Sequence, residues 1–269
     1  MTLEFFSALD TGRARSNNED AVTWDAETAV LVLADGMGGY NAGEVASGMA
    51  TTFVCSELGR WLREAAATAS DVDVRRAMDI CVENANREIF NAANSNAHYA
   101  GMGTTLVVAA FRQQRLLIGH VGDSRAYRLR AGRLTQLTRD HSLLQEQVDA
   151  GLLTVEQAAF ASHKNLVTRA VGVEDTVLLE THVHDVQAGD LYLFCSDGLS
   201  DMLDDATVKR LLIEHPTLDS AGKALVDAAN EAGGKDNIAV ILARVPRVMN
   251  ASASRWWPFN RQSGLRAPT

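Results

Sequence analysis

The sequence predicts a layered α+β domain, in which short strands mix with paired helices instead of alternating with single ones. Apolar, partly β-branched runs at residues 29–34 and 104–111 predict strands that are buried on both faces. Between them, residues 43–66 and 72–93 carry apolar side chains at helical spacing, which predicts a helical hairpin. Because strict βαβ alternation is absent, α+β is favoured over a doubly wound parallel sheet.

The rest of the domain continues the same mixture of elements. The turn pair Ala131-Gly132 separates two strand-like runs and is typical of a tight hairpin. A meander of this kind predicts that part of the sheet is antiparallel. Strands are expected at residues 115–121, 124–130, 133–138, 177–184, 190–195 and 237–244, and helices at residues 206–214 and 219–231. No loop-rich stretch divides the first 245 residues, so one compact domain over residues 1–245 is expected.

Composition excludes several classes of protein. The chain has 269 residues, 25 Lys and Arg against 34 Asp and Glu, and a net charge of −9. Nucleic-acid and anionic-membrane binders need an excess of basic side chains, so neither is expected as a general partner. Only 3 cysteines occur, without a C-x-x-C pair, which favours a reducing compartment. No apolar run reaches the ~18 residues of a membrane span and no signal-peptide pattern is present, which together predict a cytoplasmic protein.

The last segment, residues 246–269, differs in kind from the domain. It contains arginines but no acidic residue, and it includes the cluster Trp256-Trp257-Pro258-Phe259. We expect a flexible tail; the alternative is a docking segment for an acidic partner or a membrane surface.

Five aspartates follow or precede strand-like runs, each within two residues of Gly, Ser or Asn: Asp20, Asp35, Asp123, Asp197 and Asp236. An aspartate at a strand end is by itself an ordinary turn former. Five carboxylates in one cleft, however, would repel one another unless cations neutralised them. Oxygen-only ligands suit magnesium or manganese better than zinc, so the pattern predicts a hard divalent-metal site. The neighbouring glycines would allow a backbone carbonyl, such as that of Gly36, to approach an ion.

An ordered set of motifs resembles the metal-dependent protein serine/threonine phosphatases of the type 2C family, in their bacterial form. The motifs span residues 8–244, and each is weak alone but specific in this order. They are R-S-N-N-E-D from Arg15, D-G-M-G-G from Asp35, G-E-V-A-S from Gly43, G-M-G-T-T from Gly101, V-G-D-S-R from Val121, R-D-H-S from Arg139, S-D-G-L from Ser196 and D-N-I from Asp236.

The resemblance implies a four-layer α-β-β-α sandwich with two antiparallel sheets and metals in a cleft at one edge. It implies that Asp35 bridges two core Mn²⁺ or Mg²⁺ ions and that the Gly36 carbonyl binds one of them. Asp197 and Asp236 would bind the other ion. The remaining implied ligands are Glu19 and Asp20, acting through water, and Asp123, which with Asp197 would form a weaker third site.

The implied chemistry is hydrolysis of phosphoserine and phosphothreonine monoesters on proteins. Two divalent ions can share a water, lower its pKa and hold it in line with the phosphorus, so no covalent protein nucleophile is required. Arg15 is the expected phosphate-binding residue, because a guanidinium presents a planar fork of donors to two phosphate oxygens. The expected partners are phosphoproteins, including a bacterial Ser/Thr protein kinase that the enzyme opposes, and a monomer is expected.

The sequence does not identify the group that protonates the leaving alkoxide. Met37 and Tyr40 stand where many relatives have histidine, which leaves His141, His163 or metal-bound water as candidates. The pair His182 and His184 is interpreted as simple alternation along an edge strand.

Two other functions remain as alternatives to catalysis on kinase substrates. One is a pseudophosphatase that binds phosphoproteins, which the complete set of aspartates disfavours. The other is a regulatory phosphatase of an anti-sigma-factor antagonist, which the absence of an attached sensor domain disfavours.

Overall fold

The computed structural model describes residues 3–38, 42–65, 68–154, 157–158 and 166–246. Within these ranges the strands form two antiparallel sheets, with strand orders β1-β11-β10-β7-β8 and β2-β3-β5-β6-β9. The first sheet contains β1 (Glu4–Asp10), β7 (Arg125–Arg130), β8 (Arg133–Gln136), β10 (Leu191–Cys195) and β11 (Ile238–Arg244). The second contains β2 (Asp20–Asp25), β3 (Val30–Met37), β5 (Leu106–Arg112), β6 (Arg115–Val121) and β9 (Glu180–Asp185), and the short β4 (Gly103–Thr104) pairs with the end of β3.

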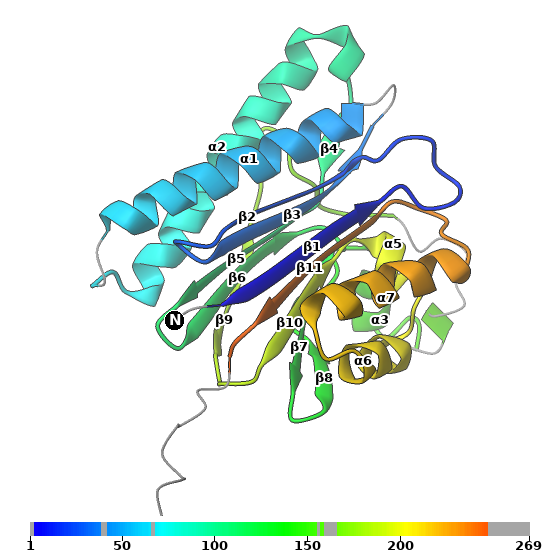
Figure 1. Ribbon diagram of the computed structural model, residues 1–269. Coiled ribbons are helices and arrows are strands. Elements are labelled where there is room, and N and C mark those ends of the chain that lie inside the picture. Colours follow the sequence, from blue (N-terminus) through cyan, green and yellow to red (C-terminus); the bar gives the residue numbers. More distant parts are fainter. Residues whose placement is uncertain (1–2, 39–41, 66–67, 155–156, 159–165, 247–269) are drawn as a thin grey trace, which may run out of the picture.

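Helices cover the outer face of each sheet (Figure 1). The long pair α1 (Ala42–Glu64) and α2 (Asp71–Ser95) lies on the second sheet, and a 3₁₀ turn, η1 (Ala97–Tyr99), follows α2. The pair α6 (Asp205–Glu214) and α7 (Leu218–Glu231) lies on the first sheet. The short helices are α3 (Leu143–Asp149) and α5 (Asp197–Ser200). This arrangement confirms the predicted four-layer α-β-β-α sandwich.

Side-chain alternation along the strands creates a separate apolar layer at each of the three interfaces. In β3, Val30 and Val32 pack under α1 and α2, whereas Leu31 and Leu33 point between the sheets. In β10, Leu193 packs under α6 and α7, and its neighbours Tyr192 and Phe194 point between the sheets. The central strands are therefore buried on both faces, as their continuous apolar runs predict.

The predicted meander is wrong at one connection. Strands β7 and β8 form the expected hairpin, with Ala131 and Gly132 at positive φ, but β6 and β7 belong to different sheets. The chain crosses from one sheet to the other through residues 122–124. The apolar runs did not reveal β1 and β2. Strand β1 is an edge of the first sheet, and β2 is an edge of the second.

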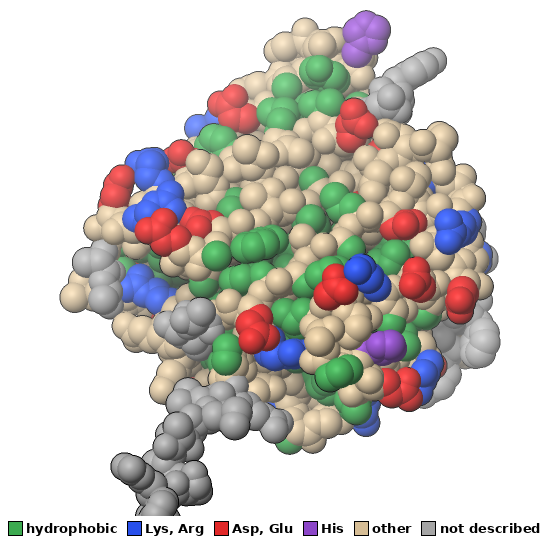
Figure 2. All heavy atoms as spheres, in the orientation of Figure 1, with side chains coloured by type: hydrophobic (Ala, Val, Ile, Leu, Met, Phe, Trp, Pro, Cys, Tyr) green, Lys and Arg blue, Asp and Glu red, His purple; other side chains and the backbone are tan. Residues whose placement is uncertain are grey.

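The composition directs attention to the surface charges and to the cysteines. On the face shown in Figure 2, Lys and Arg side chains are scattered among Asp and Glu and do not form a basic patch. Cys55, Cys81 and Cys195 are buried and unpaired. None of the described helices is long and apolar enough to cross a membrane. Of the predicted tail, residues 246–269, all but the first residue lie outside the described residues.

Candidate metal centre

Two of the predicted aspartates face each other on neighbouring strands. Asp20 begins β2 and pairs in register with Asp35 near the end of β3. The G-M-G-T-T motif holds the backbone of Asp35: its N–H donates to Thr105 Oγ1 at 3.0 Å, and its carbonyl accepts from the Thr105 N–H and the Thr104 hydroxyl, each at 2.8 Å. Because these contacts fix both the N–H and the carbonyl of Asp35, its carboxylate is held on a rigid backbone.

The other sheet supplies its carboxylates at the same edge of the molecule. Ser196 follows β10, and its hydroxyl donates to Asp20 Oδ2 at 2.8 Å, which ties the two sheets together. Asp197 opens α5 directly after it, and Asp236 precedes β11. Asn237 holds the preceding loop: its Oδ1 accepts from the Glu19 N–H at 2.8 Å, while its Nδ2 donates to the Asn17 and Thr11 carbonyls at 2.8 and 3.0 Å.

Burial and mutual repulsion perturb this cluster strongly. Burial, followed by the negative charges of Asp197 and Asp236, raises the pKa of Asp20 to about 7. Burial also holds the pKa values of Asp35 and Asp197 well above their usual range, and each is raised further by the other carboxylates. The pKa of Asp123 rises to about 6, mainly through burial. Four of the five predicted aspartates thus ionise less readily than an exposed aspartate does in the absence of a cation.

One orphaned atom shows what the cluster can hold. Asp20 is 6% exposed, and its Oδ1 has no hydrogen-bond partner among the described residues. A buried carboxylate oxygen without a donor is costly unless a cation lies against it. The surrounding donors are all oxygens, so the residues present fit magnesium or manganese better than zinc.

Arg15 and Glu19 lie on the loop that borders the same cluster. The Arg15 guanidinium donates to Asp236 Oδ2 at 2.8 Å, and half of its side chain remains exposed. Glu19 has its pKa raised by burial, an effect that the positive charge of Arg15 opposes. Arg15 is therefore held at the rim of the cluster with donors that can still reach a ligand from solvent.

Close backbone packing explains the glycines around Asp35. A Cβ added to Gly36 would lie 2.1 Å from the Gly43 carbonyl oxygen and 2.6 Å from that of Glu19. The end of β3 can approach the Glu19 backbone and the start of α1 only because Gly36 has no side chain.

A cavity of about 510 Å³ adjoins the cluster. Asp123 and Asp197 line part of it, and Leu144 and Val148 of α3 line another part. The cavity therefore gives a large ligand room beside the carboxylates.

The structure brings the predicted set together from both sheets, with Glu19, Asp20, Asp35, Gly36 and Asp123 contributed around the second sheet and Asp197 and Asp236 around the first. Tyr40 and His163 lie outside the described residues. His141 is 6% exposed, and both of its ring nitrogens contact other protein groups, Gly122 and Glu180. These contacts argue against His141 as the proton donor to the leaving group.

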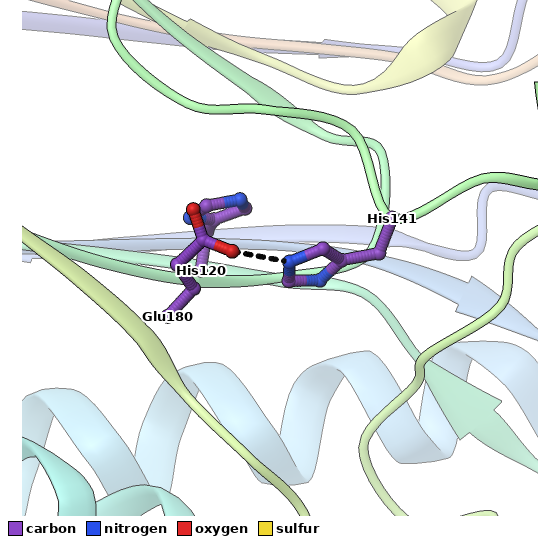
Figure 3. Close-up of side chains that lie close together, drawn as sticks. All are labelled: His120, His141 and Glu180. Atoms are coloured by element: carbon purple, nitrogen blue, oxygen red, sulfur yellow. Dashed lines mark hydrogen bonds and ion pairs between the residues drawn. The ribbon is translucent and has the colours of Figure 1, made fainter. Parts of the chain in front are cut away.

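Sequence reasoning missed a second polar cluster. Ligand atoms of His120, His141 and Glu180 lie within 4.8 Å of one another, and the rings of His120 and His141 stack at 4.6 Å (Figure 3). The only sequence signal was the alternation of His182 and His184, which lie on β9, an edge strand as predicted.

Residues 12–243 match the family model described as protein phosphatase 2C. The chain belongs to the protein phosphatase 2C family. The matched residues cover nearly all of the sandwich. Membership of the protein phosphatase 2C family makes the chain a metal-dependent phosphatase.

One bacterial relative and two solved structures illustrate what this protein phosphatase 2C chain is similar to. The chain is 37% identical over 236 residues to the serine/threonine phosphatase stp of Listeria innocua, covering 87% of this chain and 92% of that one. A crystal structure of the Mycobacterium tuberculosis serine/threonine phosphatase PstP/Ppp is 36% identical, covers 92% of this chain and all of that one (100%), and superposes with a TM-score of 0.84. A complex of the PstP catalytic domain with 2 manganese ions is 36% identical over 91% of this chain and 98% of that one, with a TM-score of 0.78.

Proposed function

We propose that this chain hydrolyses phosphoserine and phosphothreonine monoesters on proteins in a bacterial cytoplasm, as a monomer that opposes a Ser/Thr protein kinase. The names of its relatives support the substrate class. The catalytic unit in this proposal is residues 1–245, with residues 246–269 as an appended tail. The proposal includes no nucleic-acid partner, because the chain has a net charge of −9.

The observation that carries the proposal is the convergence of buried carboxylates from both sheets around the orphaned oxygen of Asp20. In this proposal Asp35 would contact both core ions, the Gly36 carbonyl would bind one of them, and Asp197 and Asp236 would bind the other. Asp20 and Glu19 would act through water. Asp123 and Asp197 contribute to a third, weaker site. Bound Mn²⁺ or Mg²⁺ supplies an activated water for in-line attack on phosphorus.

The chain's own residues bind and orient the substrate. Arg15 exchanges its contact with Asp236 for two phosphate oxygens, since both are charge-assisted hydrogen bonds of similar strength. The cavity beside Asp123 and Asp197 leaves room for the polypeptide that bears the phosphate. Met37 supplies no proton at the position where eukaryotic members of the family are expected to have histidine, so no side chain of the described residues is assigned as general acid.

The proposal is tested by assaying a phosphothreonine peptide with and without added Mn²⁺. We expect hydrolysis only with the metal, and loss of at least about a hundredfold in kcat/KM on Asp35→Asn or Asp197→Asn, because each removes charge stabilisation of the transition state. Asp219→Asn, on an exposed turn of α7, is the matched control and should keep full activity. Hydrolysis that persists in EDTA would exclude the mechanism.

A further inference from the structure

His141 makes two hydrogen bonds to the backbone of Gly122, the residue that precedes Asp123. The His141 N–H donates to the Gly122 carbonyl at 2.9 Å, and the Gly122 N–H donates to His141 Nδ1 at 3.2 Å. Both polar groups of Gly122 are therefore satisfied by one residue, 19 positions away in sequence. His141 itself is almost fully buried.

The second contact defines the protonation of the ring. Because Nδ1 accepts from Gly122, the proton of neutral His141 is on Nε2, which donates to Glu180 Oε2 at 3.1 Å (Figure 3). The other oxygen of Glu180 contacts His182 Nε2 at 2.9 Å. Glu180 thereby fixes the tautomer and the orientation of His141, as an outer carboxylate does for a functional histidine.

The same contacts disfavour a metal ion in this second cluster. A metal on His141 Nε2 would need the proton on Nδ1, where it would face the Gly122 N–H. His120 Nε2 is already paired with the Arg139 carbonyl at 2.8 Å, which leaves His120 Nδ1 as a single buried atom without a partner among the described residues. A chain of hydrogen bonds from Glu180 through His141 to Gly122, called the relay below, accounts for the geometry better than a set of metal ligands.

Gly122 is the point at which the chain crosses between the sheets. Its φ of +101° is a conformation that favours glycine. On the other side of the turn, the hydroxyl of Ser124 is paired with Thr105 Oγ1 at 2.8 Å, and Thr105 also holds Asp35. The turn that bears Asp123 is thus held by Thr105 on one side and by His141 on the other.

We propose that His141, oriented by Glu180, is a positioning residue that fixes the turn at residues 122–124 and so sets the affinity of Asp123 for a divalent cation. The inference rests on the proposed role of Asp123 as a metal ligand. It assigns to the R-D-H-S motif a task that is distinct from phosphate binding and proton transfer.

The test separates the two hydrogen bonds of the ring. His141→Asn places an acceptor near the position of Nδ1 but cannot reach Glu180, whereas His141→Gln reaches towards Glu180 and offers Gly122 no acceptor at that position. We expect His141→Gln to weaken Mn²⁺ binding at the lower-affinity site by about tenfold, the equivalent of one lost hydrogen bond. His141→Asn should retain most of the wild-type affinity for Mn²⁺. In both variants kcat at saturating Mn²⁺ should stay within about twofold of the wild-type value.

Two readouts do not depend on activity. Mn²⁺ binding is measured without substrate, from the electron paramagnetic resonance signal of the free ion. Amide exchange of Gly122 in the metal-free protein reports its N–H bond directly and should accelerate in His141→Gln but much less in His141→Asn. Glu180→Ala, which leaves the His141 ring in place but unoriented, should shift both readouts in the same direction as His141→Gln.

Two reference variants make the outcomes decisive. His182→Ala removes the contact on the far side of Glu180 and should leave both readouts near wild type. Asp123→Asn should weaken the same Mn²⁺ site; if it does not, the proposed role of Asp123 fails. If Asp123→Asn weakens the site and His141→Gln does not, the positioning role alone is overturned. Zn²⁺ retained by the wild type and lost in His120→Ala would replace the relay with a metal site.

Discussion

At the scale of the residue, the buried carboxyl of Asp20 has a consequence for the pH dependence of stability. A buried acid whose pKa rises on folding binds its proton more tightly in the folded state, so it destabilises that state once it must ionise. For Asp20 the stability is lost as pH rises from its ordinary value of 3.8 to about 7. Asp35 and Asp197 act in the same direction.

We therefore expect the metal-free protein to lose thermal stability between about pH 4 and pH 7 relative to Asp20→Asn, whose side chain cannot ionise. Added Mn²⁺ should raise the Tm of the wild type more at pH 7.5 than at pH 5, because it binds the ionised cluster. Differential scanning calorimetry in EDTA and in Mn²⁺ provides both comparisons. A wild-type profile parallel to that of Asp20→Asn would contradict the raised pKa.

Arg15 gives a second prediction at this scale. Arg15→Ala removes a contact to phosphate in both the ground state and the transition state, so KM should rise at least about tenfold with a smaller change in kcat. Steady-state kinetics on a phosphothreonine peptide measures the split. Arg13→Ala, a change to an exposed arginine of the same loop, is the control. A fall in kcat at constant KM would argue against phosphate binding by Arg15.

Single residues were also where sequence reasoning reached furthest. Each of the five aspartates stands within two residues of a turn-forming residue near a strand end, so the motifs marked Asp20 although 176 positions separate it from its partner Ser196. Glu180 carried no such mark. Its contact with His141 depends on which strand becomes the edge of the sheet, and that is decided by tertiary packing.

At the scale of the element, two of the three glycines of α1 lie in opposite environments. Gly43 packs against the site: an added Cβ would lie 2.8 Å from the Gly36 carbonyl carbon and 2.6 Å from Glu19 Oε2. Gly48, one turn further on, has no atom within 4 Å of an added Cβ.

We expect Gly43→Ala to lower the free energy of unfolding by about 1–3 kcal/mol through overpacking. Gly48→Ala should raise it by about 1 kcal/mol, because alanine is the better helix former and loses less backbone entropy. Urea unfolding of the two variants measures the difference. Changes of the same sign would mean that helix propensity outweighs the contact with Glu19.

Sequence patterns predicted most elements but not their pairing. Residues 115–138 read as one meander, because period-two alternation shows which face of a strand is buried and not which strand lies beside it. The glycine at 122 breaks the run, but a hairpin turn and a crossing between sheets look alike at that level. Ile118 and Tyr127, both buried, lie in different sheets for this reason.

At the scale of the whole molecule, three apolar layers are stacked through one pair of sheets. Leu58 is buried in the layer under α1 and α2, and Leu225 in the layer under α6 and α7. If residues 1–245 form one domain, the layers unfold together, since the central strands of both sheets contribute side chains to the layer between the sheets.

We expect Leu58→Ala and Leu225→Ala each to cost about 2–5 kcal/mol and to lower the Tm of one shared transition. Calorimetry distinguishes this from two domains, in which each variant would shift a different transition. A calorimetric enthalpy equal to the van't Hoff enthalpy in both variants would identify a single cooperative unit.

The pairing of β1 with β11 sets the order in which the molecule can be completed during synthesis. Glu4 stands opposite Arg244, and β11 separates β1 from β10. Strand β1 therefore has no neighbour in its sheet until β11 has been synthesised. Asp236 reaches the cluster with β11, so a nascent chain holds an incomplete set of carboxylates until that strand is made.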